Sequence, residues 1–151
     1  MPEIQWTNDL DTGIPVIDKQ HRRLVEYINQ LDHARTHHSR DEVSSVLDQL
    51  VDYTLSHFAF EESLMEDAGY PFLNAHKRVH ALFVKRIADY QQRFKVGEDI
   101  GAELQVSLTT WLLNHIKNDD DDYADDVKRA LGGATEETGG WVARSIKKFF
   151  G

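Results

Sequence analysis

Cysteine is absent from the 151 residues of this chain. Its absence excludes disulfides, thiolate metal sites and cysteine nucleophiles. Proline and glycine are scarce, at three and nine residues, and no internal repeat or low-complexity stretch divides the sequence. A chain of this length without such interruptions fits one domain with a single substantial core.

Positive charge is also in short supply, with 17 basic against 26 acidic residues and a formal net charge of −9. This balance argues against a nucleic-acid-binding surface, which needs a basic patch. No run approaches the roughly 20 apolar residues of a membrane span. The first six residues have neither the basic start nor the apolar core of a signal peptide. We therefore expect a soluble, cytoplasmic protein.

Four segments carry apolar residues with the 3.6-residue period of an amphipathic helix. The expected helices begin near Ile17, Asp41, Leu73 and Asp99. Pro71 and Gly97 are expected to follow the ends of the second and third. Because short connections place consecutive helices antiparallel, the sequence predicts an all-α, up-down-up-down four-helix bundle over residues 1–131. Residues 1–16 lack the helical period and are expected to form an extended arm over the core.

The chain has eight histidines, which is many for its length. His57 and Glu61 are four residues apart, as are His76 and His80, and residues four apart lie on the same face of a helix. These positions fall on the apolar stripes, so their side chains are expected to point inward. The predicted inward ligands on the four helices are His21, His57, Glu61, His76, His80 and His115.

A single buried histidine is more often a hydrogen-bonded core residue than a metal ligand. Burying five imidazoles and a carboxylate without compensation would be costly, whereas a metal binds neutral imidazoles and ionised carboxylates directly. The set exceeds the ligand count of a tetrahedral zinc site, and calcium and magnesium prefer oxygen-rich shells. Imidazoles with a bridging carboxylate suit iron, and their number suits two ions. The paired Glu-x-x-His motifs of ferritin-like di-iron proteins are absent from this sequence.

Six short motifs lie in a fixed order between residues 6 and 123. They are Trp6-Thr7, Gly13–His21, His57–Glu62, Tyr70-Pro71, His76–His80 and Trp111–Ile116. With these motifs the chain resembles the hemerythrin family, and most closely its single-domain bacterial members. The resemblance implies a four-helix bundle that holds two non-haem iron ions, bridged by carboxylates and by an oxo or hydroxo group.

The resemblance also implies which residues bind each ion. The ligands of one iron would be His76, His80 and His115. The ligands of the other would be His21 and His57. This second iron keeps an open position, where family members bind dioxygen end-on and release it without net chemistry. Glu61 would bridge the two ions together with an aspartate that follows His115.

The identity of that aspartate depends on the local helix geometry. Asp119 is four residues after His115 and would share its face on a regular helix, whereas the family spacing of five selects Asp120. A five-residue step turns by about 140° on a regular helix, so the family spacing implies a bulge or an end of the helix here. We predict Asp120 as the ligand, supported by Tyr123 three residues later. The other aspartates of this run are expected to form a solvated acidic segment.

Reversible binding of dioxygen needs an apolar, water-poor wall beside the open iron. The candidates for this wall are Leu24, Phe58, Trp111, Leu112 and Ile116. Each of them is equally an ordinary residue of a bundle core. No side chain on the inward stripes stands out as a general acid, which favours binding over catalysis.

Three functional interpretations follow from the resemblance. The first is a non-enzymatic carrier, store or scavenger of dioxygen. The second is an oxygen or redox sensor that acts through a separate partner, because no signalling module is attached. The third is an enzyme whose di-iron centre reduces peroxide or nitric oxide.

Two segments lie outside the predicted centre. His33 and His37, at the far end of the first helix with His38, are expected to be solvated. Residues 132–140 are rich in glycine and read as a flexible linker, followed at 141–151 by a short cationic amphipathic helix of charge +3. This helix is expected to dock on the acidic bundle, or else to bind a membrane surface or a protein partner.

Overall fold

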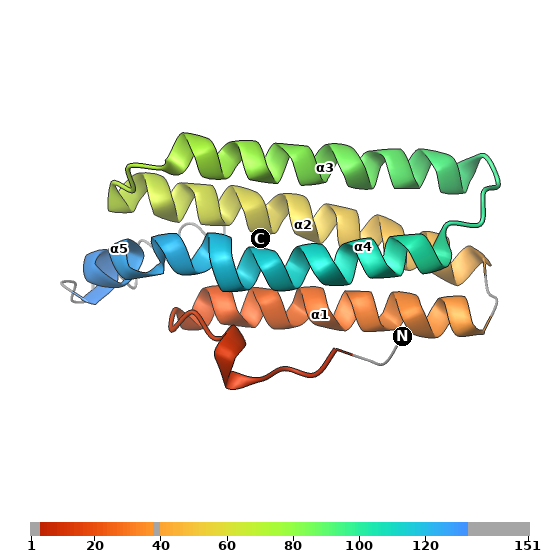
Figure 1. The fold of residues 1–151 in the computed structure, drawn as a ribbon, viewed down its shortest axis with the longest axis horizontal. Helices are drawn as coiled ribbons and strands as arrows, with labels where there is room; N and C mark the ends of the chain where they lie inside the picture. The colour runs from red at the N-terminus through yellow and green to blue at the C-terminus, as the bar shows by residue number, and fades with distance from the viewer. Residues whose placement is uncertain (1–3, 38–39, 133–151) are drawn as a thin grey trace.

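Four long helices lie side by side in the computed structural model, which describes residues 4–37 and 40–132 (Figure 1). They are α1 (Pro15–Thr36), α2 (Arg40–Ala68), α3 (Leu73–Lys95) and α4 (Gly101–Asn114). Each runs opposite to the one before it, and α1 packs against both α2 and α4. The predicted all-helical, up-down-up-down bundle is confirmed, and its helices begin within two residues of the predicted starts. Among the described residues, no helix combines the length and the apolar character needed to span a bilayer.

The fourth helix changes its hydrogen-bonding pattern at its end. Residues His115–Asp120 form a π-helix, η2, and the chain continues as α5 (Asp121–Gly132) (Figure 1). A π-helix bonds residue i to residue i+5 and so takes up one more residue than an α-turn. The predicted irregularity after His115 is therefore confirmed. The side chain of Asp120 lies outside the described part of the chain, so this ligand stays a prediction.

Burial continues beyond η2. Along α4 the buried residues Leu108, Leu112 and His115 are spaced by four and three. On α5, Tyr123 and Val127 are fully buried and belong to an apolar cluster with residues of α1 and α2. Helix α5 is therefore part of the bundle core.

The N-terminal arm lies against α1, as predicted, but it is shorter than predicted. Helix α1 begins at Pro15, so the last two residues of the predicted arm 1–16 are already helical. Proline fits this first helical position because its missing N–H would have no partner there. Within the arm, Asn8–Leu10 form a 3-10 turn, η1. The backbone N–H and C=O of Ile4 both bond to the side chain of Asn29, at 2.9 and 3.1 Å.

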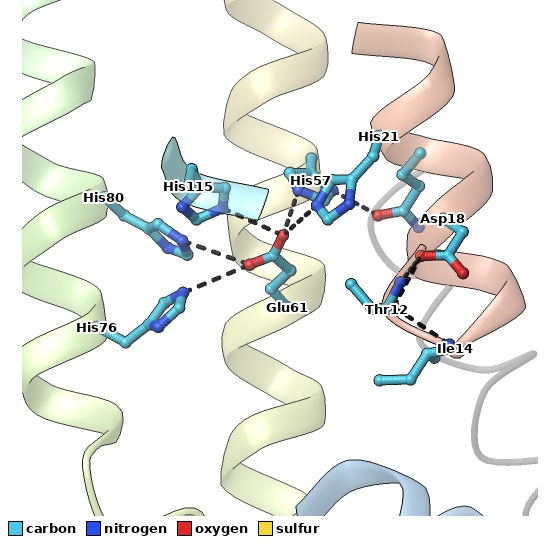
Figure 2. A network of polar contacts seen from close by, with 10 residues as sticks. Thr12, Ile14, Asp18, His21, His57, Glu61, His76, His80 and His115 are labelled. Atoms are coloured by element: carbon cyan, nitrogen blue, oxygen red, sulfur yellow. Dashed lines mark hydrogen bonds and ion pairs between the residues drawn. The ribbon is translucent and has the colours of Figure 1, made fainter. Parts of the chain in front are cut away.

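The carboxylate of Asp18 fixes the turn between the arm and α1. It accepts hydrogen bonds from Thr12 N and Oγ1 at 2.8 and 2.7 Å, and from Gly13 N at 3.2 Å. Gly13 has a φ of 86°, a left-handed conformation that favours glycine. Asp18 is three residues before His21, so this turn sets the start of the helix that carries a predicted ligand (Figure 2).

We expect Asp18→Ala to lower the free energy of unfolding of the metal-free protein by about 1.5–3 kcal/mol, because it removes hydrogen bonds to a charged acceptor. Urea denaturation followed by circular dichroism measures this change. The matched control is Asp52→Ala at an exposed position of α2, which should leave the midpoint nearly unchanged. Equal midpoints for the two variants would contradict the role given to Asp18.

The core has two apolar clusters with a polar layer between them. The larger cluster is built from residues of α1, α2, α3 and α4 and includes Leu24 and Leu112. The smaller cluster packs α5 against the rest of the bundle and includes Ile17, Leu64 and Tyr123. On α1, His21 lies between Ile17 of one cluster and Leu24 of the other. The predicted ligands therefore sit in a layer that apolar side chains close on both sides.

The C-terminal predictions fall mostly beyond this description. Gly132, the first residue of the predicted linker 132–140, is the last residue of α5. The rest of that linker and the predicted amphipathic helix 141–151 lie outside the described residues.

Candidate metal centre

Five histidines and one glutamate from four helices meet inside the bundle (Figure 2). Helix α1 supplies His21, α2 supplies His57 and Glu61, α3 supplies His76 and His80, and the start of η2 supplies His115. Each of them is at most 6% exposed, and Glu61 is completely buried. The structure thus brings together six of the seven predicted ligands. The periodicity of the apolar stripes explains this placement, because each ligand replaces an aliphatic residue on an inward face.

Glu61 lies at the middle of the cluster, with its two carboxylate oxygens facing different histidines. Its Oε1 is 3.3 Å from His21 Nε2 and 3.5 Å from His115 Nε2, and it also contacts His57 Nε2. Its Oε2 is 3.6 Å from His76 Nε2 and 3.5 Å from His80 Nε2. Five imidazoles therefore surround one carboxylate, three on one oxygen and two on the other.

His115 lies between the two sets of histidines. Its ring centroid is 5.1 Å from that of His80 and 5.6 Å from that of His76. The corresponding distances to His21 and His57 are longer, at 6.1 and 6.4 Å. The ring positions therefore group His115 with α3, although its nitrogen faces the oxygen shared with His21.

The charge state of Glu61 suits a metal ligand. Burial by itself would raise the pKa of its carboxyl group. The positive charges of His57 and His115, with hydrogen bonds from His115 and His21, outweigh burial and hold this pKa well below its ordinary value of 4.5. Glu61 is therefore an ionised carboxylate at neutral pH, and an ionised carboxylate is the form that binds a metal.

The donor atoms fall into two groups that share Glu61. One group contains His21, His57, Glu61 and His115, and the other contains Glu61, His76, His80 and His115, with the donor atoms of each within 4.8 Å of one another. Donor atoms bound to one ion at roughly 2 Å lie about 3–4 Å apart, which matches the separations around Glu61. Glu61 Oε2 and His80 Nε2 are buried and find no hydrogen-bond partner among the described residues. Imidazole and carboxylate donors in these numbers fit two iron ions.

Aromatic rings cover the histidines of α3 and η2. The ring of Phe58 stacks on His80 at 3.8 Å and 5°, and Trp111 stacks on His115 at 4.6 Å and 13°. Tyr123 contacts His76 edge to face, with centroids 5.3 Å apart. These contacts fix the orientation of three imidazoles and exclude water from that side of the centre.

The residues predicted to form an apolar wall lie in one part of the core. Four of them, Leu24, Phe58, Leu112 and Ile116, are at most 3% exposed and belong to the larger apolar cluster. Trp111 is only partly buried and packs at the edge of this cluster. Whether these residues line a path for a gas stays a prediction.

Three residues near the centre were missed by the sequence reasoning. Gln20 bonds through Oε1 to His57 Nδ1 at 2.7 Å. A carboxylate oxygen of Glu62 lies 3.6 Å from His80 Nδ1. Tyr123, which the sequence suggested only through its spacing from Asp120, places a buried phenol group beside His76. The centre therefore has more polar side chains around it than the inward stripes alone predict. Gln20 and Glu62 each adjoin a ligand in the sequence, and only this adjacency could have pointed to them.

The other described histidines behave as expected. His33 and His37 are exposed at the end of α1, and their rings lie 4.1 Å apart. His37 Nδ1 also lies 2.8 Å from the backbone oxygen of His33. In the described part of the chain, neither belongs to a group of residues that could hold a metal.

Comparisons with known proteins agree with this geometry. The family described as the hemerythrin HHE cation binding domain matches residues 12–127. Bacteriohemerythrins of Stenotrophomonas maltophilia and Pseudomonas aeruginosa are 54% and 51% identical to this chain, over the full length of both proteins in each pair. A crystal structure of wild-type hemerythrin superimposes with a TM-score of 0.79 at 30% identity and covers 83% of this chain and 98% of its own.

Proposed function

Because this chain belongs to the hemerythrin family, we propose that it binds dioxygen reversibly at two non-haem iron ions, as a carrier, store or scavenger of oxygen. When bound, the pair of irons supplies the electrons for reversible oxygen binding. The protein supplies the ligands, the spacing of the two ions and the dry surroundings.

Each ligand has a proposed place in this centre. The ligands of the first ion are His76, His80 and His115. The ligands of the second ion are His21 and His57. Glu61 joins the two ions, with Asp120 as the proposed second bridge. The second ion then has one imidazole fewer than the first, and this difference leaves room for a small ligand.

The observation that carries the proposal is the position of Glu61 between the histidines of α3 and those of α1 and α2. Its Oε2 faces His76 and His80, whereas its Oε1 faces His21 and contacts His57, so the carboxylate is suited to join two ions. The ring of His115 is nearer to those of His76 and His80 than to those of His21 and His57. With His115 assigned to that side, one ion would have an imidazole fewer than the other, unlike the metal of a closed structural site, in which protein fills every position.

The apolar surroundings support binding over hydrolysis or proton-coupled turnover. The polar layer lies between two apolar clusters, and four of the five predicted wall residues, Leu24, Phe58, Leu112 and Ile116, are buried. Exclusion of water from such a site limits proton leakage and side reactions. A reversible carrier depends on that exclusion.

The decisive test is optical. Protein loaded with Fe(II) without oxygen should be nearly colourless, gain a visible absorption band on exposure to oxygen, and lose it again under vacuum through repeated cycles. Control samples without iron should show no band. Irreversible loss of the band after one exposure would overturn the carrier role, and sustained consumption of peroxide or nitric oxide with a reductant would favour the enzyme instead.

Replacing Leu24 should shorten the lifetime of the oxygen-bound protein. Leu24 is 2% exposed, one turn from His21 on α1, and Leu24→Ser would open space for water beside the second ion. We expect the visible band to decay at least about tenfold faster in air, the factor that corresponds to about 1.4 kcal/mol in the barrier.

Leu31→Ser is the matched control for this substitution, because Leu31 is a fully buried leucine on α1 two turns farther from His21. It should destabilise the bundle without hastening the decay. Equal decay rates in the two variants would show that general destabilisation, and not water near the ion, governs the lifetime.

A further inference from the structure

Gln20 makes a short hydrogen bond at the back of a predicted ligand. Its side-chain Oε1 lies 2.7 Å from His57 Nδ1, and both residues are buried, with Gln20 only 5% exposed. An amide oxygen only accepts hydrogen bonds, so His57 Nδ1 carries the proton and donates it to Gln20. When His57 is neutral, as a metal ligand must be, its lone pair is then on Nε2, the atom that faces Glu61.

His80 differs from His57 at the equivalent atom. Its Nδ1 has no hydrogen-bond partner among the described residues, and the nearest carboxylate oxygen, from Glu62 with a 25% exposed side chain, lies 3.6 Å away. A carboxylate behind a metal-bound imidazole makes it a stronger electron donor, and a neutral amide does so much less. The two sets of ligands therefore differ in their outer partners as well as in their number.

From this difference we propose that Gln20 is a positioning residue for the two-imidazole metal position, an inference that rests on the proposed di-iron function. It fixes the tautomer and the ring orientation of His57 so that Nε2 is offered to the ion. This position has the fewest protein ligands, so the orientation of each of its imidazoles matters most. As a neutral acceptor, Gln20 also keeps His57 a weaker donor than a carboxylate would.

The test uses Co(II), which reports ligand geometry by its visible spectrum and does not need oxygen. Wild-type protein should bind two equivalents. Gln20→Leu cannot accept a hydrogen bond and should bind one of the two equivalents about 10- to 100-fold more weakly, the range found for lost outer partners, with the other equivalent unchanged. Gln20→Glu can accept and should restore binding. In the iron-loaded protein, Gln20→Glu should also lower the reduction potential.

The matched control is Gln105→Leu on α4. Gln105 is 2% exposed, and its Oε1 makes no hydrogen bond in the described part of the chain, so this variant replaces a buried amide without releasing an imidazole. It should bind both equivalents like the wild type. Nitrogen-15 NMR of the metal-free protein, at a pH high enough for His57 to be neutral, gives a second measurement, since its single proton should be on Nδ1 in the wild type and lose this preference in Gln20→Leu.

Each result bears on one proposal only. A wild type that binds no Co(II) and no iron would refute the di-iron function itself. A wild type that binds both ions, with Gln20→Leu binding them equally tightly, would overturn the role of Gln20 alone. Equal weakening by Gln20→Leu and Gln105→Leu would show a packing effect and overturn it too. If Gln20→Leu does not fold, an unchanged reduction potential in the iron-loaded Gln20→Glu variant would overturn the role of Gln20.

Discussion

Replacing Glu61 by glutamine should remove most of the metal from the protein while leaving the bundle folded. Glutamine has nearly the same size, so the packing between the two apolar clusters is kept. The glutamine side chain has no negative charge. It also has only one oxygen, whereas the two oxygens of Glu61 face different histidines. Loss of an outer partner already weakens metal binding by about 10- to 100-fold, so loss of the shared carboxylate should exceed about 100-fold. Iron per chain, measured by elemental analysis after desalting, checks this.

The neighbouring carboxylate provides the control for Glu61→Gln. Glu62 is a quarter exposed and approaches only the back of His80, at 3.6 Å. Glu62→Gln should therefore keep both ions and alter affinity modestly at one. Similar iron contents in the two variants would mean that the carboxylate between the histidines does not join the ions, and the proposed centre would need another bridge.

The fold was predictable because its apolar pattern is regular. On α2 the residues that follow the helical period are all buried, because one face of the helix points into the core; they are Val43, Leu47, Leu50, Thr54, His57, Glu61 and Leu64. Helix ends were predictable where a glycine or proline restricts which backbone conformation the chain can adopt. Gly97, with a φ of 101°, comes two residues after Lys95, the last residue of α3. Pro15 was the exception, because proline fits the first turn of a helix as well as it fits an arm.

The six ligands were predictable for the same reason, as polar residues on inward faces. Their partners were not, because a partner is set by how two helices meet. Gln20 lies beside the inward stripe of α1 and reaches His57 on α2 across the interface. No periodicity within one helix encodes this contact. The irregular turn after His115 came only from the family spacing, since the apolar pattern alone would have selected Asp119.

Removing the metal should lower the melting temperature markedly. The layer between the two apolar clusters consists of five imidazoles and a carboxylate. These groups converge only in the folded chain, so bound ions stabilise the folded state and not the unfolded one. At free metal about 1,000 times its dissociation constant, this linkage contributes about 4 kcal/mol. For a chain of this size, each kcal/mol in the free energy of unfolding changes the melting temperature by about 2–4 °C, so we expect the melting temperature to fall by roughly 8–16 °C. Scanning calorimetry of loaded and chelated protein measures it. The Glu61→Gln variant is the control, and its melting temperature should barely respond to the chelator.

Acid should separate the contribution of the metal from that of Glu61. Imidazoles bind metal only when neutral, so the stability gained from the metal should disappear as the pH falls through roughly 6.5, the ordinary pKa of histidine.

Glu61 behaves differently, because its pKa is lowered in the folded chain. A lowered carboxyl pKa contributes stability that is present above the ordinary value of 4.5 and is lost only as the pH falls through the lower folded value. Metal release should therefore precede the loss of the Glu61 contribution. If the loaded and chelated proteins differed equally at pH 7 and pH 5, the ions would not be held by histidines.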